Sequence, residues 1–327
     1  MNPKKYKIGV IGLGPVGLML GHYFNKANCD VVLCSRNEEH IDLIKSEGVH
    51  LAGTKDERSQ FSEICSSIED LVKSNVDIIV SAVKAYQIDS VLHEINLHNR
   101  NPSLMIIAAQ NGIGIVDKYS FLFDLSKIFR FVINFAGNMN APNVVNVTFI
   151  ISPNYIASVD DSRPDISKWI EDVLSSVELF TKSVDSFELT KETWHKTILN
   201  ASLSPLCAIS KLTMREAMKI PDTNEIIERI IMEAMEVAKA EDIRFEKNFV
   251  KLCLRYLSKA GNHFPSLAVD LLNKKQTEID FINGQLVQYG RKHYIRTPLN
   301  LTFTNMIRAI TKENLKSNQP TLTNVNE

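Results

Sequence analysis

The sequence predicts an α/β domain built on a mostly parallel, doubly wound sheet, followed by an all-α domain. The chain has 327 residues, of which 44% are hydrophobic, and this is enough to bury the cores of two domains. From residue 7 to about residue 160, short β-branched runs alternate with helix-like stretches, which is typical of a parallel sheet covered by helices. Beyond Asp185 nearly every apolar pattern has helical spacing. We therefore expect domains at residues 1–185 and 186–315, and a polar, disordered tail at 316–327.

The expected strands of the first domain are short apolar runs. In chain order they read KIGVIG, DVVLCS, DIIVSAV, SLMIIAA, KIFRFVIN, VNVTFII and YIASVD. A helix is expected at ISKWIEDVLSSVE, and the link FTKSVDSFE leads into the second domain. There, NEIIERIIMEAMEVAKAED has apolar residues at helical spacing, and LAVDLLNKKQTEIDFINGQLVQYGRK reads as one long helix.

Charge and cysteine content argue against several classes of protein. Lys and Arg number 37 against 38 Asp and Glu, so no net charge draws the chain to nucleic acid or to an anionic membrane. No run approaches the ~18–20 apolar residues of a membrane span, and the N-terminal sequence lacks a signal-peptide cleavage site, which favours a cytoplasmic protein. Five cysteines without C-x-x-C or His/Cys spacing argue against a disulfide framework and a metal site. We expect reduced thiols, no metal, and neither nucleic acid nor membrane as a partner.

A glycine-rich turn follows the first expected strand. Gly12, Gly14 and Gly17 form G-x-G-x-x-G between an apolar strand and an apolar helix, the context that the dinucleotide-binding fingerprint requires. Gly12 would allow the tight turn, Gly14 the approach of a pyrophosphate, and Gly17 the close packing of helix on strand. A glycine turn that arose by chance is the alternative. The cofactor would contact the whole turn, namely Gly12, Leu13, Gly14, Pro15, Val16 and Gly17.

The end of the second expected strand carries an arginine where NAD sites usually carry an acid. Arg36 can present a planar, permanently charged fork to a 2′-phosphate, which favours NADPH over NADH. Glu38 and Glu39 lie past the expected position and read as the first turn of the next helix. A solvated surface arginine is the alternative.

Two further polar residues follow expected strands at the edge where doubly wound sheets bind ligands. Lys84 comes after DIIVSAV and Asn111 after SLMIIAA. The alternatives are a lysine whose stem covers apolar surface and an asparagine favoured by turn geometry.

The stretch ETWHKTILNASLSP predicts a narrow polar stripe on a helix. Lys196, Asn200 and Ser204 are each four residues apart, about one helical turn, and apolar residues flank them. Such a stripe favours a cleft, although the wet edge of an amphipathic helix is the alternative. His195 points away from the stripe by about 100° and reads as structural.

These motifs together resemble the ketopantoate reductase (2-dehydropantoate 2-reductase) family. The resemblance spans about residues 7–312 and rests on the glycine turn with its later arginine and on VKAYQ, QNGIG, WHKTILN and TEIDFINGQLV in that order. It implies a Rossmann domain joined to a helical domain, with the substrate between them. It also implies NADPH-dependent reduction of a 2-oxo acid to a 2-hydroxy acid, with ketopantoate of pantothenate biosynthesis as the family's substrate. The oligomeric state is left open, with a homodimer as one candidate.

The resemblance assigns roles to individual residues. Lys196 would be the general acid, with Asn111 and Asn200 orienting the substrate and the lysine. Glu278 would lie near the nicotinamide ribose or position the lysine; its alternative is a solvated helix acid. Ser266 matches the family's substrate serine, against the alternative of a helix cap. On the same basis, the residues expected around the cofactor beyond the glycine turn are Arg36, Lys84, Asn111 and Glu278, and those around the substrate are Asn111, Lys196, Asn200, Ser204 and Ser266.

The sequence departs from the family pattern where the substrate would bind. Members typically carry a second asparagine before a proline, and this chain has Ser204 there. Ahead of Ser266, His263 replaces a substrate amide or Asn262 supplies it one residue away. The sequence therefore leaves open ketopantoate or a related 2-oxo acid, and a module that binds NADPH without turnover is a third alternative.

Overall fold

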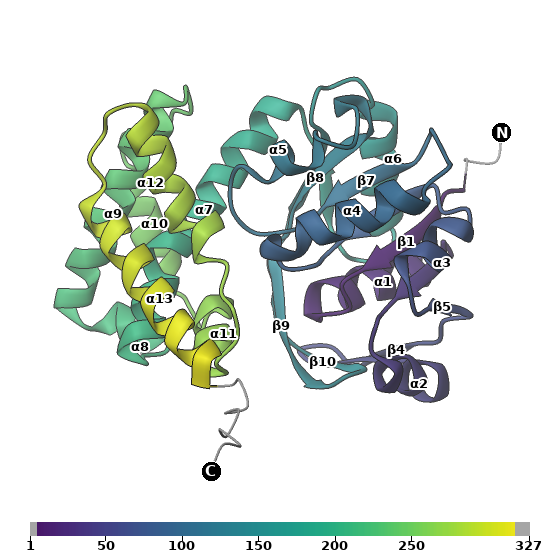
Figure 1. The fold of residues 1–327 in the computed structure, drawn as a ribbon. Helices are drawn as coiled ribbons and strands as arrows, with labels where there is room; N and C mark the ends of the chain where they lie inside the picture. Colours follow the sequence, from purple (N-terminus) through teal and green to yellow (C-terminus); the bar gives the residue numbers. More distant parts are fainter. Residues whose placement is uncertain (1–4, 318–327) are drawn as a thin grey trace, which may run out of the picture. The chain divides into compact units, whose positions relative to one another are not determined.

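The computed structural model describes residues 5–317 and divides into two compact units (Figure 1). The first, the α/β unit, runs to Gln110 and resumes at Gly114–Glu192. The second, the helical unit, contains the short segment Asn111–Ile113 and the chain from Thr193 onward. Most of the predicted tail, residues 318–327, lies outside the described part of the chain.

The α/β unit is built on one large sheet whose strand order is β12-β11-β8-β7-β6-β1-β2-β5. Neighbouring strands are parallel except for the pair β11 and β8, so the prediction of a mostly parallel sheet is confirmed. The chain leaves β1 toward β2 on one side and returns to β6 on the other, which makes the carboxyl ends of β1 and β6 the switch point of the sheet. The strands are β1 (Lys7–Ile11), β2 (Asp30–Cys34), β5 (Glu63–Cys65), β6 (Ile78–Ser81), β7 (Met105–Ala108), β8 (Ile128–Val132), β11 (Asn154–Ser158) and β12 (Thr181–Ser183).

Helices connect these strands and cover the sheet (Figure 1). α1 packs beside α6, whereas α3, α4 and α5 follow one another; the right-handed connections put helices on both faces. Side chains fix two of the helix starts, because Asn37 caps α2 and Ser67 caps α3. The helices are α1 (Pro15–Lys26), α2 (Glu38–Glu47), α3 (Ile68–Lys73), α4 (Ile88–His98), α5 (Ile115–Tyr119) and α6 (Pro164–Ser175), with short 3-10 turns at η1 (Ala85–Gln87) and η2 (Leu125–Lys127).

A second, four-stranded sheet corrects one prediction. The run VNVTFII, expected in the large sheet, forms β10 in a sheet of order β4-β3-β10-β9. It pairs antiparallel with β9 and parallel with β3, and its buried Val145 and Val147 share one hydrophobic core with strands of the large sheet. The small sheet contacts α1, where buried His22 is hydrogen bonded to Glu57 (3.1 Å) and Ser59 (2.7 Å) of β4. Its strands are β3 (Val49–Gly53), β4 (Glu57–Ser59), β9 (Phe135–Ala141) and β10 (Val144–Ile150).

The helical unit has its own apolar core. α9, α12 and α13 lie side by side (Figure 1), and Ile198, Ile227, Ala234 and Leu286 are fully buried among them and α7. The helix predicted at NEIIERIIMEAMEVAKAED is confirmed as α9. The helices are α7 (Ser186–Ser210), α8 (Met214–Lys219), α9 (Pro221–Ala240), α10 (Phe249–Leu257), α11 (Ser266–Leu272), α12 (Asn283–Lys292) and α13 (Pro298–Ser317), with η3 (Ile279–Phe281) ahead of α12; the first turns of α7 belong to the α/β unit.

The single long helix predicted over LAVDLLNKKQTEIDFINGQLVQYGRK is wrong. α11 ends at Leu272, Lys274 takes a left-handed conformation (φ 54°), and a turn with η3 precedes α12. The polar run NKKQTE supplies no apolar face to bury, so the helix stops there. The interruption brings Glu278 to the start of η3. Among the helices of residues 5–317, none is both long and apolar enough to cross a bilayer.

Candidate active site

The glycine turn joins β1 to α1 with very little free space on one side. Gly12 has φ 92°, and a Cβ there would lie 2.5 Å from the backbone nitrogen of Val83, which follows β6. A Cβ on Gly17 would lie 2.0 Å from the carbonyl oxygen of Gly12. The turn is therefore pressed against the end of β6, at the switch point of the sheet.

The other side of the turn fits a dinucleotide pyrophosphate. A Cβ on Gly14 would meet nothing within 4 Å, so this residue borders open space. Within residues 5–317 no side chain caps α1, and its first turn contains no acid. The backbone N–H groups at the start of α1 are thus available to an anion, and the helix dipole favours a negative charge there. Pro15 at the first position removes one N–H without disturbing the helix.

The residues after β2 form a short turn that leads into α2. Arg36 is exposed, two residues past the end of β2, and can reach a ligand at this edge of the sheet. Glu38 and Glu39 are confirmed as the first turn of α2. The turn between β2 and α2 is fixed by Ser35, whose hydroxyl accepts from the backbone N–H of Asn37 (3.2 Å). A cation, and not an acid, is therefore the first charged group beyond β2.

Lys84 lies three residues beyond β6, next to the glycine turn. It is half-buried, and its backbone N–H donates to the side-chain oxygen of Gln87 (3.3 Å) in η1. Because Gly12 packs against Val83, the lysine and the glycine turn share the carboxyl edge of the sheet. The structure thus brings Lys84 and the glycine turn together.

Beneath this edge lies a buried polar network that sequence reasoning missed. The Gln110 amide donates to the carbonyl (2.9 Å) and hydroxyl (3.1 Å) oxygens of Ser81, and the Tyr119 hydroxyl also donates to the Ser81 hydroxyl (2.8 Å). Buried Arg130 donates to the carbonyl oxygens of Ala108 and Gln110. Burial raises the pKa of Tyr119 to about 12, so it stays a hydrogen-bond donor at neutral pH. The network ties the ends of β6, β7 and β8 together ahead of Asn111.

Lys196, Asn200 and Ser204, which we call the lysine stripe, lie on α7 in the helical unit. Lys196 and Asn200 are half-buried, and Ser204 is 5% exposed, so the stripe runs from partial exposure into the core. The wet edge of an amphipathic helix is therefore a poor description of it. His195 packs edge-on against Phe249 (ring centroids 5.3 Å apart), as expected of a structural residue.

Pro205 follows Ser204 inside α7 and removes one helical hydrogen bond. A proline has no N–H, so the carbonyl of Ala201, four residues earlier, loses its helical donor. The side-chain amide of Asn283 donates to this carbonyl instead (2.9 Å) and also to Asn300 (3.0 Å). Asn300 in turn donates to Glu233 (2.8 Å).

This chain of groups, Asn283, Asn300 and Glu233, connects α7 to α12, α13 and α9. Asn283 and Asn300 are fully buried. Two features of the sequence could have pointed to these contacts, namely the proline within the helical pattern of α7 and the asparagine within TEIDFING. Neither one indicates that the two residues lie close together in the fold. We refer to these three residues as the amide network.

Asn111 and Glu278 are carried by two segments that pack together in the helical unit. The N–H of Ile113 donates to the carbonyl of Phe281 (3.2 Å), and a Cβ on Gly112 would lie 2.1 Å from the same oxygen. Asn111 therefore lies beside η3, which begins directly after Glu278. Glu278 is 6% exposed, so its interpretation as a solvated acid is wrong.

Ser266 is less clearly connected to this group. It is exposed at the first position of α11, and no described side chain caps that helix, so the interpretation as a cap is wrong. Asn262 is exposed and accepts from the Thr213 hydroxyl (2.8 Å) at the start of α8. His263 is half-buried, and burial lowers its pKa, which favours the neutral ring.

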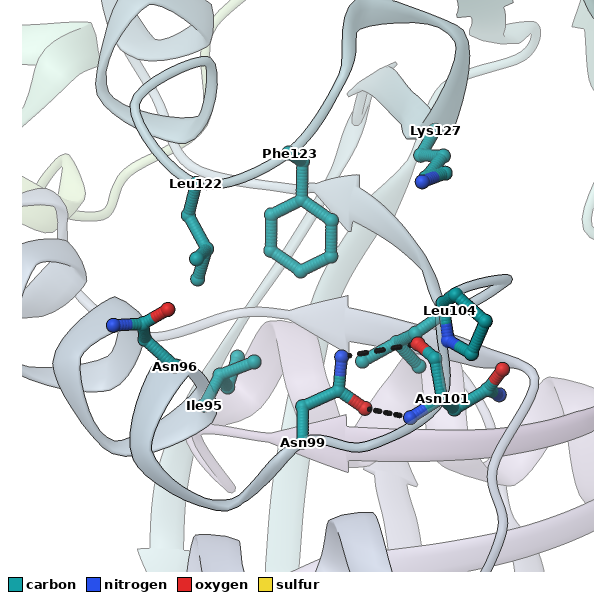
Figure 2. A pocket seen from close by; sticks show the side chains of 9 residues that line it. Ile95, Asn96, Asn99, Asn101, Leu104, Leu122, Phe123 and Lys127 are labelled. Carbon is teal, nitrogen blue, oxygen red and sulfur yellow. Dashed lines mark hydrogen bonds between the residues drawn. The ribbon is translucent and has the colours of Figure 1, made fainter.

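Two other features bear on the choice of site. Within the described part of the chain, no cluster of three or more His, Cys, Asp or Glu side chains could hold a metal ion. A pocket of about 190 Å³ is drawn in Figure 2. Its lining residues Leu104 and Lys127 directly precede β7 and β8, so it lies at the amino ends of these strands, whereas the glycine turn follows the carboxyl end of β1. Figure 2 shows that Asn99 in this pocket is already bonded to the backbone of Asn101 (2.9 and 3.1 Å), whereas the candidate residues lie elsewhere.

Comparison with known proteins identifies the family. Residues 8–160 match Ketopantoate reductase PanE/ApbA, and residues 188–311 match Ketopantoate reductase PanE/ApbA C terminal. A 2-dehydropantoate 2-reductase of Streptococcus pyogenes is 26% identical over 302 residues, which cover 92% of this chain and 96% of that protein.

Solved structures show the same fold. D-mandelate dehydrogenase with NADH and anilino(oxo)acetate (TM-score 0.84, 23% identity) and a ketopantoate reductase of Ralstonia eutropha (TM-score 0.84, 22% identity) each cover 94% of this chain and are themselves covered to 99%. A ketopantoate reductase of Staphylococcus aureus with this fold (TM-score 0.77, 18% identity) is described as dimeric. The chain belongs to the ketopantoate reductase PanE/ApbA family, whose members are NAD(P)-dependent 2-oxo acid reductases.

Proposed function

We propose that this protein reduces ketopantoate to pantoate with NADPH, with Lys196 as the general acid. The observation that carries the proposal is the lysine stripe, which combines a half-buried cation with amide and hydroxyl groups on one helical face. The family relationship supports a 2-oxo acid as substrate, and the S. pyogenes relative supports ketopantoate among the 2-oxo acids.

The cofactor preference is proposed from the first charged group beyond β2. Arg36 would pair with a 2′-phosphate through two parallel hydrogen bonds, which NADH cannot accept there. The N–H groups at the start of α1 would hold the pyrophosphate, with Lys84 nearby. Asn111 and Glu278 would complete the cofactor contacts around the nicotinamide and its ribose.

Reduction of a 2-oxo acid requires a proton donor at the oxygen of its C2 carbonyl. When bound, the reduced nicotinamide would supply a hydride to C2 of the 2-oxo acid. Negative charge then develops on the carbonyl oxygen, where the Lys196 ammonium would stabilise it and donate the proton, an effect of roughly 10²–10⁴-fold for a general acid. Asn111 and Asn200 would orient the substrate, and buried Glu278 would orient the lysine or the ribose.

A different 2-oxo acid is the second candidate substrate. Ser204 replaces the longer asparagine side chain of the family pattern, and D-mandelate dehydrogenase has the same fold. A shorter side chain leaves room for a bulkier substrate but offers less reach to a hydroxyl-bearing tail.

The test is oxidation of NADPH by the purified protein, followed by nicotinamide absorbance, with ketopantoate, 2-oxoisovalerate, pyruvate and phenylglyoxylate as substrates. Ketopantoate should be the best substrate, and Lys196→Ala should lower kcat by roughly 10²–10⁴-fold without weakening NADPH binding. Lys191→Ala, five residues earlier on the same helix, is the matched control. Preference for another 2-oxo acid would indicate that Ser204 accompanies a change of substrate from ketopantoate to that acid. Binding of NADPH with no turnover of any of these acids would favour the alternative that the protein binds the cofactor without catalysis.

We also propose a homodimer, by analogy with the dimeric S. aureus relative. A cytoplasmic location is proposed from the sequence, which lacks a signal-peptide cleavage site. Light scattering coupled to gel filtration would give the oligomeric state directly.

A further inference from the structure

Two cysteines face each other across the edge of the large sheet, next to the expected phosphate site. Cys34 is the last residue of β2 and Cys65 the last residue of β5, and the two are direct partners in the parallel register. Partners in register point to the same face of a sheet, and neighbouring strands are about 4.7–4.9 Å apart. This spacing falls within the range of about 4.4–6.8 Å between the Cα atoms of cysteines in disulfides.

The two thiols differ in their surroundings. The Cys65 thiol lies 3.5 Å from the carbonyl oxygen of Leu33 on β2, and its interaction with the Cys34 thiol lowers the pKa of Cys65 while raising that of Cys34. Burial and the carboxylates of Asp70 and Glu63 oppose the lowering at Cys65. Cys65 is partly exposed whereas Cys34 is buried, so Cys65 is the thiol that an oxidant in solution reaches first.

The strand that carries Cys65 is a short edge strand. β5 has three residues and lies at the end of the sheet, with β2 as its single neighbour there. A disulfide needs its Cβ atoms about 3.5–4.5 Å apart, so β5 would move toward β2 by no more than roughly 1 Å. An edge strand this short can make such a shift without disturbing the strands beyond β2.

The link to the cofactor site is direct. The N–H of Ser35 donates to the carbonyl of Cys65 (3.1 Å), and Ser35 in turn fixes the turn that carries Arg36. We propose that Cys34 and Cys65 form a reversible disulfide between β2 and β5, and that this modification weakens NADPH binding at Arg36. The second half of the proposal rests on the proposed function.

The reaction balances with a small-molecule disulfide, such as oxidised glutathione, as the oxidant. The Cys65 thiolate attacks one glutathione sulfur, forming a mixed disulfide and releasing one glutathione thiolate. The Cys34 sulfur, after losing its proton to solvent, then attacks the Cys65 sulfur and releases the second glutathione. The two cysteines together lose two electrons and two protons, and the glutathione disulfide becomes two thiols.

The experiment exposes the full-length protein to oxidised glutathione, blocks remaining thiols with an alkylating reagent and identifies linked peptides by mass spectrometry. We expect a peptide pair joining Cys34 to Cys65, lost on treatment with dithiothreitol. Cys65→Ser and Cys65→Ala should prevent the link. Cys29→Ser is the matched control, because Cys29 is also a partly buried cysteine of the α/β unit and should leave the link intact. Glutathione adducts without the link, or oxidation confined to Cys29, would overturn the disulfide.

Calorimetric titration of NADPH into the reduced and oxidised forms tests the coupling. Oxidation should weaken NADPH binding roughly tenfold in the unmodified chain and in Cys29→Ser, and leave Cys65→Ser unchanged. If the reduced protein and the fully disulfide-linked protein bind NADPH equally well, the proposed effect on cofactor binding is refuted, whereas the disulfide itself stands. If the reduced protein does not bind NADPH, the proposed function fails, and the peptide analysis still decides the disulfide.

Discussion

The two units hold their candidate residues by different means. In the α/β unit, Gly12 and Gly17 press the turn against neighbouring backbone, and Lys84 takes its place from the end of a strand. In the helical unit, the carbonyl of Ala201 on α7 depends on a side chain of another helix, Asn283. A site formed by backbone geometry can be located from local sequence, whereas a site formed by buried side-chain contacts depends on segments far apart in the chain.

The largest effect is expected from removing the amide network. Asn283→Leu would leave the Ala201 carbonyl and the Asn300 side-chain oxygen buried without a donor, at about 1–3 kcal/mol each in unfolding free energy. Denaturant unfolding measures the loss, and kcat measures the accompanying displacement of the lysine stripe.

Pro205→Ala provides the control for this prediction, because it restores the N–H that α7 lacks. In that background Asn283→Leu should cost about 1–3 kcal/mol less, which a double-mutant cycle would detect. Additive losses would mean that Asn283 does not act through the Ala201 carbonyl.

The next effect tests the backbone side of the comparison. Gly17→Ala places a methyl group against the Gly12 carbonyl and should lower the unfolding free energy by about 1–3 kcal/mol, as overpacking does. Gly14→Ala is the matched variant, since its methyl enters open space and should change stability by less than about 1 kcal/mol. It should still weaken NADPH binding by blocking the pyrophosphate. Equal melting temperatures for the two variants would remove the distinction between the packed and open sides of the turn.

A smaller effect is expected at Arg36, whose side chain is exposed and lies outside the buried networks described above. Arg36→Ala should weaken NADPH binding roughly tenfold and leave NADH binding unchanged. Titration with both cofactors decides the matter, with Arg58→Ala on β4 as a control for the loss of charge. Parallel losses for NADPH and NADH would show that Arg36 does not recognise the phosphate.

The smallest effect concerns His22, the buried contact between α1 and the small sheet. Burial lowers its pKa below 6.5, against the opposing contact with Glu57, while Lys26 and Lys55 add to the lowering. The unfolded chain therefore binds a proton that the folded chain resists, so this part of the stability is present above pH 6.5 and is lost as pH falls from there toward the folded pKa.

The slope from one group cannot exceed about 1.4 kcal/mol per pH unit. Urea unfolding at several pH values should give a shallower dependence in His22→Gln than in the unmodified chain. His93→Gln, an exposed residue of α4, should not change it. An unchanged slope in His22→Gln would assign the pH dependence to other groups.

Local pattern was sufficient for much of the fold and part of the site. The glycine turn, the first turn of α2 and helix α9 follow from short motifs whose geometry is set within a few residues. β4 and β5 have three residues each, too few to show alternation, and the partners of β10 are fixed by pairing across about ninety residues. Asn283 was visible within TEIDFING, but its role exists only because Pro205 removes a donor elsewhere.

The segment Asn111–Ile113 limits how this protein can be divided. These three residues belong to the helical unit, although the chain before and after them belongs to the α/β unit. Within the helical unit, Gly112 and Ile113 pack against the carbonyl of Phe281. A gene fragment beginning at Thr193 would encode most of α7 and every later helix of the unit, and would still lack the residues that cover the Phe281 carbonyl. The two halves of the sequence are thus not independent modules: a chimera that joins this α/β unit to a relative's helices must also match the seat of position 112, where only glycine fits.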